Sequence, residues 1–468
     1  MSQVRLPVIQ SEPPHSMGEG SLGRDGRHKR PYPADVAGRF VTRRRIVYAA
    51  LIALWVALPW IPINGNPAVF LDIEKRQFFL FGLTFNAQDV WLLFFLMSGV
   101  GFSLLYATAV LGRVWCGWAC PQTVFLEAFF RPIERFFQGP RNVALRRAAG
   151  GMTFDRLWRT IATHAAYAVA AVFVAHVFLA YFVSLPRMFA MVRMKPGAHP
   201  EAFAWTIIAT GVMYANFAFF REQLCVVICP YGRLQSVLLD DDSLVVGYDE
   251  KRGEPRGKAG TTDGACVDCH RCVVVCPTGI DIRDGLQLDC VACTACIDAC
   301  DEVMDKLARP RGLVRYDSLR GLRGEKRRFL RPRLYAYTAA AVVGAVVATF
   351  AFRSREPLEA NVVRLPGLPY VREGGTIRNA FELHLVNKQS TAVSFEIEPL
   401  DSPDLAFVVA VPKVDIEALG SRRVAVFVTM EQSKFVTDRP FVLRVHGRDG
   451  SGKSIEHDAR AVFLGARP

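Results

Sequence analysis

The chain is organised around the stretch Cys266-Val-Asp-Cys269-His-Arg-Cys272-Val-Val-Val-Cys276-Pro277 and its second copy, Cys290-Val-Ala-Cys293-Thr-Ala-Cys296-Ile-Asp-Ala-Cys300. This spacing is typical of two-cluster bacterial ferredoxins, in which three close cysteines bind one cluster and the fourth ligand comes from the other motif. The spacing therefore predicts two 4Fe–4S clusters. One set of ligands would be Cys266, Cys269, Cys272 and Cys300, and the other Cys290, Cys293, Cys296 and Cys276.

Structural zinc is the alternative interpretation of these cysteines. Two closed zinc sites need only four thiolates each at tetrahedral spacing, and they do not require a crosswise arrangement of three ligands plus one. Asp301 follows Cys300 where a second proline is expected, but this difference removes no ligand. The iron–sulfur interpretation is therefore favoured.

The composition indicates a membrane protein. Of 468 residues, 51% are hydrophobic although 22% are charged, and several uninterrupted apolar runs reach the roughly 20 residues that span a bilayer. The net charge of +13 comes from Lys and Arg beside these runs, as the positive-inside rule expects of cytoplasmic loops. This distribution disfavours nucleic acid binding.

Five membrane spans are predicted, roughly at 46–63, 90–111, 161–185, 203–224 and 334–352. The arginines that precede the first span place the N-terminus in the cytoplasm, and cluster-binding thiolates belong in a reducing compartment. The expected domains are a disordered cytoplasmic tail at 1–40, a four-helix membrane domain at 41–240, a cytoplasmic ferredoxin domain at 241–333, a fifth transmembrane helix at 334–352 and an outer domain at 357–468.

The outer domain is predicted to be all-β. Its segments, such as Phe381–Val386 and Arg423–Val428, alternate between apolar and polar residues with the period of two expected of half-buried strands. About seven strands in about 110 residues suggest an immunoglobulin-like sandwich. The predicted fold class is thus an α-helical polytopic membrane protein with an inserted two-cluster ferredoxin domain and a C-terminal immunoglobulin-like sandwich.

The other four cysteines form two membrane pairs, Cys116-x3-Cys120-Pro121 and Cys225-x3-Cys229-Pro230, at the predicted cytoplasmic ends of the second and fourth spans. Residues four apart share a helix face, so each pair presents two sulfurs in one direction. Matching positions suggest an internal repeat whose thiols meet near the inner membrane surface. Soft thiolates suit Cu(I), and a pair is also able to cycle as a disulfide. The simpler alternative is that these cysteines are small buried hydrophobes.

Other candidates are weaker. His164 and His176 lie in the third predicted span, where an ionisable residue is a functional hypothesis by default, but packed histidines are favoured over haem ligands. The thioethers of an outer loop are Cu(I) ligand candidates, although apolar packing is favoured for them; they belong to Met188, Met191 and Met194. Glu127 and Glu134 have arginine neighbours and are expected to form surface ion pairs.

The chain resembles the FixG/RdxA/CcoG family of bacterial cytochrome oxidase accessory proteins. The resemblance rests on Trp115-Cys116-Gly117-Trp118-Ala119-Cys120-Pro121-Gln122-Thr123, on the second pair within 225–232, on the double ferredoxin motif and on the outer sandwich. It implies a bacterial inner-membrane iron–sulfur protein with a periplasmic C-terminal domain. It also implies a cupric reductase that supplies Cu(I) during assembly of a cbb-type cytochrome oxidase, with copper bound by Cys116, Cys120, Cys225 and Cys229. The expected partners are oxidase subunits, copper-delivery proteins, membrane lipid, a cytoplasmic electron donor and a second copy of the chain.

Two alternatives stay open. The first is a quinol-oxidising electron conduit of the NapH or NosR kind that passes electrons to a respiratory reductase. Such proteins also pair membrane Cys-x3-Cys-Pro motifs with two clusters, but NapH-like chains lack the outer sandwich. The second is a non-catalytic scaffold for oxidase assembly, in which the clusters are structural. The scaffold is suggested by residues 357–468, which offer no catalytic base or nucleophile.

Overall fold

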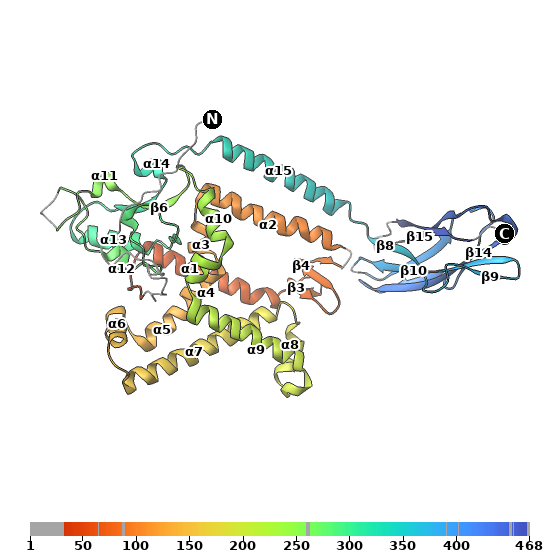
Figure 1. The fold of residues 1–468 in the computed structure, drawn as a ribbon, viewed down its shortest axis with the longest axis horizontal. Helices are drawn as coiled ribbons and strands as arrows, with labels where there is room; N and C mark the ends of the chain where they lie inside the picture. Colours follow the sequence, from red (N-terminus) through yellow and green to blue (C-terminus); the bar gives the residue numbers. More distant parts are fainter. Residues whose placement is uncertain are drawn as a thin grey trace. The chain divides into compact units, whose positions relative to one another are not determined.

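The computed structural model describes residues 32–63, 65–86, 89–258, 263–389, 391–400, 402–448, 452 and 454–465. Most of the predicted N-terminal tail, residues 1–31, lies outside the described residues. The chain divides into two compact units (Figure 1). The first unit is Met1–Leu83 with Leu93–Val346, and the second is Thr84–Leu92 with Val347–Pro468.

Four helices are long and apolar enough to cross a membrane: Trp91–Leu111 within α2 (Val90–Leu111), α7 (Phe154–Leu179), the segment Pro200–Phe220 that begins with α9 (Pro200–Ala215), and α15 (Pro332–Arg353). Few of their residues are buried against protein, and many large apolar side chains on them are exposed. Such all-round apolar helices are typical of membrane spans. α7 and α9 pack against each other (Figure 1).

The predicted first span differs from the others. Most of its residues lie in α1 (Arg39–Ala57), and the rest lie in η1 (Leu58–Trp60), β1 (Pro62–Ile63) and the residue between them. α1 begins Arg-Phe-Val-Thr-Arg-Arg-Arg and is not one of the four apolar helices found among the described residues. The four apolar helices agree with the predicted class of a polytopic membrane protein with about five spans, but the arginines that were expected to precede the first span lie within the first turns of α1. Of these arginines, Arg44 is buried.

The segment before α1 is also more ordered than a tail. The backbone N–H of Ala34 donates to the carbonyl oxygen of Val274 at 2.9 Å. The carboxylate of Asp298 accepts hydrogen bonds from the N–H groups of Phe40 (3.2 Å) and Val41 (2.8 Å). Free N–H groups in the first turn of a helix need such acceptors, so a residue of the second cluster motif caps α1.

The ferredoxin block consists of short elements around a small core. Its two strands are β6 (Val245–Tyr248) and β7 (Val314–Asp317), which pair antiparallel. Its helices are α11 (Glu250–Gly253), α12 (Arg271–Val274), η7 (Ile282–Asp284), α13 (Ala295–Lys306) and α14 (Leu319–Leu322). Cysteines pack among apolar side chains of the core such as Ile297 and Met304.

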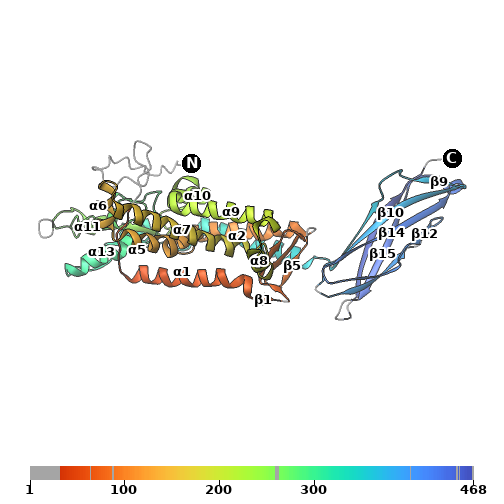
Figure 2. The ribbon, with the colours of Figure 1, turned by 90° about the horizontal axis from the view of Figure 1, so that it is seen from below.

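The second unit contains a two-sheet sandwich (Figure 2), as predicted from the alternating pattern. One sheet has the order β12-β14-β10-β8 with β9 on β10, and the other β13-β11-β15-β16. The strands are β8 (Leu358–Arg364), β9 (Val371–Glu373), β10 (Thr376–Asn387), β11 (Val393–Pro399), β12 (Ala406–Val409), β13 (Lys413–Ile416), β14 (Ser421–Glu431), β15 (Arg439–Arg448) and β16 (Ser454–Phe463). Alternate residues of β14 and β15 are buried, which is the pattern of strands with one face in a core.

Candidate functional site

The two cysteine loops of the ferredoxin block share one backbone conformation. In the first loop, Asp268 (φ 51°) and His270 (φ 53°) flank Cys269; in the second, Ala292 (φ 51°) and Thr294 (φ 63°) flank Cys293. Residues other than glycine rarely adopt positive φ. Its recurrence at the same two positions of both motifs shows that the two loops are structural copies.

Each loop forms the wall of a separate cavity, and the fourth cysteine comes from the other motif. The first cavity is lined by Cys266, Cys269, Cys272 and Cys300. The second cavity is lined by Cys290, Cys293, Cys296 and Cys276, and also by Cys272. This grouping is the crosswise one that the spacing predicts. None of these cysteines is in a disulfide.

The surroundings of these thiols are chemically suited to metal binding. Burial raises the pKa of Cys272 and of Cys300 to about 12, and that of Cys290 and of Cys293 to about 11. Buried thiolates are costly without a cation, so these positions favour a bound metal cluster over free thiolates. Two 4Fe–4S clusters fit the two groups of four sulfurs, and they would supply one-electron redox chemistry there.

The raised pKa values predict slow alkylation of these four thiols after cluster removal. The thiolate is the reactive form, and its fraction falls about tenfold for each unit that the pKa rises. In folded, cluster-free protein at pH 8 we expect Cys272 and Cys300 to react with iodoacetamide at least about 100-fold more slowly than in denaturant. Site-resolved mass spectrometry, with circular dichroism as the check on folding, measures this. Equal rates in the folded and denatured protein would contradict the burial described.

The loop of the second cluster site is docked onto the first membrane cysteine motif. Gly117, between Cys116 and Cys120, lies so close to this loop that a Cβ atom would stand 2.8 Å from the carbonyl carbon of Ala292. The guanidinium of Arg113 donates to the carbonyl oxygens of Leu288 and, at 2.8 Å, Cys290. The first cluster site makes no contact of this kind among the hydrogen bonds of the described residues. The second cluster site is therefore the one next to the membrane cysteines.

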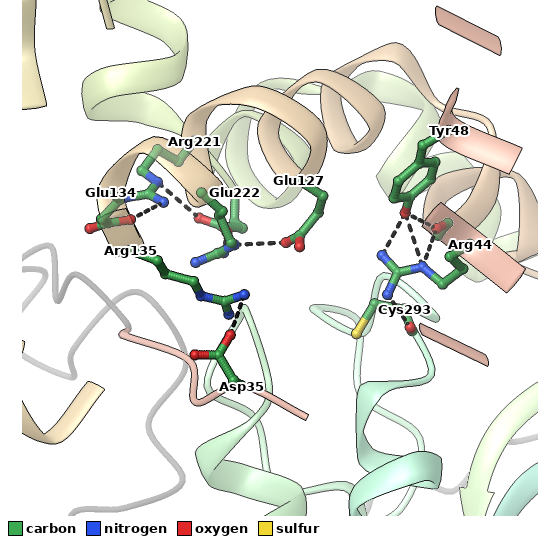
Figure 3. Close-up of polar contacts among 11 residues, drawn as sticks. Asp35, Arg44, Tyr48, Glu127, Glu134, Arg135, Arg221, Glu222 and Cys293 are labelled. Atoms are coloured by element: carbon green, nitrogen blue, oxygen red, sulfur yellow. Dashed lines mark hydrogen bonds and ion pairs between the residues drawn. The ribbon is translucent and has the colours of Figure 1, made fainter. Parts of the chain in front are cut away.

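Arg44 of α1 contacts both the first membrane cysteine motif and the second cluster loop. Its Nε donates to the carbonyl oxygen of Gly117 at 3.0 Å, and its Nη1 donates to that of Cys293 at 2.5 Å. The hydroxyl of Tyr48 also donates to the carbonyl oxygen of Gly117, at 2.6 Å (Figure 3). One guanidinium thus bridges the membrane motif and the cluster loop.

The two membrane cysteine motifs meet in the first unit. Cys116 lies in α3 (Val114–Trp118), and Cys225 lies in the π-turn η6 (Leu224–Ile228). Cys120 and Cys229 directly precede the prolines that begin α4 (Pro121–Phe125) and α10 (Pro230–Leu238). Burial, and then the charges of Cys120, Cys116 and Cys229, raise the pKa of Cys225 to about 12. The four thiols therefore lie within electrostatic reach of one another.

The four thiols of the membrane motifs are not tightly clustered. The Sγ of Cys116 lies 3.4 Å from Oε1 of Gln235. In the part of the chain that the structure describes, no three of the four sulfurs lie within 4.8 Å of one another. The arrangement presents a soft donor set, yet it does not form a compact three-sulfur site.

Buried polar contacts join the two segments that carry these motifs, residues 90–138 and residues 200–238, which are called the two hairpins below. Gln122 and Asn216 exchange side-chain hydrogen bonds of 2.7 and 3.2 Å. The Nη2 of Arg221 donates to Glu134 at 2.7 Å, and both side chains are buried (Figure 3). The prediction of a surface ion pair for Glu134 was therefore wrong: its partner comes from the other hairpin, 87 residues away.

Buried ion pairs also surround Glu127. Arg131, which is buried, donates to Glu127 at 2.7 Å and also to Glu222. The charges of Glu127 and Glu222 are thereby balanced at the junction of the two hairpins. Removing one partner from such a buried network leaves an uncompensated charge, which is strongly destabilising.

The weaker candidates lie away from the cysteines. The Nδ1 of His164 lies 2.8 Å from the hydroxyl of Tyr214 on α9, among aromatic rings. That of His176 lies 2.8 Å from the carbonyl oxygen of Val172 in its own helix. Both are packed or hydrogen-bonded histidines, the interpretation favoured from the sequence. Met188 and Met191 lie in α8 (Leu185–Val192), and Met194 follows it.

These features define a membrane iron–sulfur electron-transfer protein, and comparisons with known proteins give its family. A 4Fe–4S dicluster domain model matches residues 220–319, a 4Fe–4S binding domain model matches 91–140, and the model of the IG-like fold at the C-terminal of FixG matches 348–466. The chain belongs to the FixG/RdxA family.

Two curated relatives support this membership. Protein RdxA of Cereibacter sphaeroides is 36% identical over 374 residues, which cover 76% of this chain and 79% of the relative. The nitrogen fixation protein FixG of Rhizobium meliloti is 32% identical over 469 residues, covering 90% and 88%. The match to 91–140 is notable because that segment contains only the first membrane cysteine pair, outside the ferredoxin block.

Proposed function

We propose that this protein is a cupric reductase of the bacterial inner membrane, which uses its iron–sulfur clusters to reduce Cu(II) and supplies Cu(I) for assembly of a cbb-type cytochrome oxidase. The observation that carries the proposal is the docking of the second cluster loop onto the Cys116–Cys120 motif. Electron donor and acceptor groups that touch through backbone contacts need no further carrier between them. Oxidase subunits and copper-delivery proteins are the proposed partners.

The chain's own residues have separable roles in this proposal. Cys116, Cys120, Cys225 and Cys229 bind the copper substrate, because soft sulfur ligands favour Cu(I). Arg44 and Arg113 position the cluster loop against these thiols. Each Cu(II) ion accepts one electron, so two reduced clusters suffice for two ions.

The sidedness follows the charge distribution. We propose that the basic segments and the cluster cysteines lie in the cytoplasm, and that the sandwich domain lies in the periplasm, where it would be available to contact the oxidase. This arrangement follows from the positive-inside rule.

The test is copper reduction by purified protein whose clusters have been reduced with dithionite and freed of excess reductant. We expect replacement of the four membrane cysteines by Ala to lower the rate of chelator-trapped Cu(I) formation at least about tenfold, with the iron content unchanged. The matched control replaces Ser98 and Ser103, exposed on α2, by Ala. Equal rates in the cysteine variant and the control would remove the membrane thiols from the copper site.

A further inference from the structure

A large cavity of about 870 Å³ lies in the first unit beside the second cluster site. Its walls come from α1, from the segment formed by η3 (Leu126–Phe130) and α5 (Arg131–Gln138), from residues 33–36 and from the second cluster loop. Among the cluster cysteines, Cys293 lines it. This cavity is separate from the two cysteine-lined cavities, and the proposed copper chemistry does not use it.

One side of this cavity is apolar. Ala49, Ile52, Ala53 and Val56 of α1 line it, and their spacing of three and four residues places them on one helix face. Phe129 lines it from the facing segment. These α1 residues belong to the apolar second half of the helix, which follows its arginine-rich beginning. The apolar wall therefore suits a hydrocarbon chain.

The other side is polar but internally neutralised (Figure 3). Glu127 and Arg131 line it and pair with each other, and Asp35 pairs with Arg135. Arg44 is occupied by Tyr48 and by two carbonyl oxygens. Three of the four arginines that line the cavity, Arg44, Arg131 and Arg135, have partners, and the fourth, Arg45, is exposed to solvent. The buried part of this end therefore favours a neutral head group with hydrogen-bonding oxygens over a phosphate.

We infer that this cavity binds a membrane quinol, with its ring at the end formed by Tyr48, Glu127 and Cys293 and its isoprenoid tail along α1. A neutral ring with two hydroxyl groups matches the polar end, and a long apolar tail matches the α1 wall. Cys293, a predicted ligand of the second cluster, lines the cavity, so an electron acceptor would lie beside the ring. The inference rests on the proposed function and names its electron donor as a lipid-soluble quinol instead of a cytoplasmic protein.

Oxidation of a quinol in this cavity needs acceptors for two electrons and two protons. Oxidation of a quinol to a quinone breaks two O–H bonds and releases two electrons and two protons. The electrons go to the two 4Fe–4S clusters, one each. The protons leave through Glu127, whose carboxylate lies in the cavity wall within reach of water, being about one quarter exposed (26%). Two Cu(II) ions then reoxidise the clusters.

A photoreactive azidoquinone tests the binding site directly on cluster-containing protein in lipid nanodiscs without copper. We expect cross-links to map to α1 or to residues 126–138, and to be lost with excess unlabelled quinone but not with excess phospholipid. Ala53→Trp, which fills the apolar wall, should reduce labelling at least tenfold. Ala50→Trp is the matched control, because Ala50 is an exposed α1 residue that does not line the cavity.

Glu127→Gln tests the proton acceptor. Arg131 keeps its ion pair with Glu222 in this variant, and circular dichroism checks that the variant is folded. Glu127→Gln should leave azidoquinone labelling in place and slow the reduction of the clusters by a quinol analogue at least tenfold, while reduction by dithionite stays unchanged. Equal labelling of Ala53→Trp and Ala50→Trp would overturn the site, and displacement by phospholipid but not by quinone would identify it as a lipid site. Copper reduction by dithionite-reduced protein bypasses the cavity, so this result separates failure of the quinol site from failure of the proposed function.

Discussion

The double variant Cys276→Ala/Cys290→Ala is expected to retain one cluster, or about four iron atoms per chain, where the unaltered protein holds about eight. The reason is that Cys276 lines the cavity of the second loop, together with Cys290, although it lies in the first motif. Both substitutions therefore damage the same cluster. Iron analysis and electron paramagnetic resonance of anaerobically purified protein measure the result.

A second double variant is the matched control. Cys276→Ala/Cys266→Ala removes one ligand from each cavity and should lose both clusters. If each cluster were instead held by four consecutive cysteines of one motif, the two results would be exchanged. The pair of variants therefore distinguishes the crosswise arrangement from the consecutive one even if each single substitution lowers yield.

Gly117→Ala is expected to separate the clusters from the membrane cysteines. Its Cβ atom would stand 2.8 Å from the carbonyl carbon of Ala292 and 2.9 Å from the carbonyl oxygen of Val291, and nearer still to the oxygen of Ala292. These are backbone atoms, which do not give way as a flexible side chain does, and overpacking of this kind costs about 1–3 kcal/mol. We expect the loop to move away and copper reduction by the reduced protein to fall at least about tenfold.

The iron content should stay unchanged in Gly117→Ala, because none of the cluster cysteines is altered. Gly101→Ala is the control: Gly101 lies in α2, and a Cβ there meets nothing within 4 Å. Copper reduction at the unaltered rate in Gly117→Ala would show that the docking does not carry the electrons.

The fold was predictable where the sequence pattern is local. The spacing of Cys266 to Cys300 predicts the crosswise grouping that the two cavities show, and the alternation within β10 and β14 predicts the sandwich. Both signals repeat over a few residues and need no knowledge of the rest of the chain. The burial of Arg44 in α1 was not predictable for a related reason: apolar content near residue 50 is local, whereas this burial depends on Gly117 and Cys293, 73 and 249 residues away.

The same limit explains the missed parts of the site. Glu134 and Arg221 read as ordinary charged residues beside apolar runs, and only the packing of the two hairpins brings them together. The contact of Gln235 with Cys116 likewise joins residues 119 positions apart. The Cys-x3-Cys-Pro repeat gave the one available signal that these hairpins meet. No local pattern identifies which buried polar residues cross that junction.

The capping of α1 by Asp298 has a consequence for the order of synthesis. The ribosome makes Phe40 early, but the carboxylate that accepts its N–H follows 258 residues later, between two cysteines of the second cluster motif. Domains fold as they emerge from the ribosome, but α1 is synthesised before Asp298, which accepts its N–H groups. The first turn of α1 therefore gains its hydrogen-bond acceptor only after the iron-binding segment has been translated. The N-terminal helix is among the first parts to be synthesised and among the last to be completed.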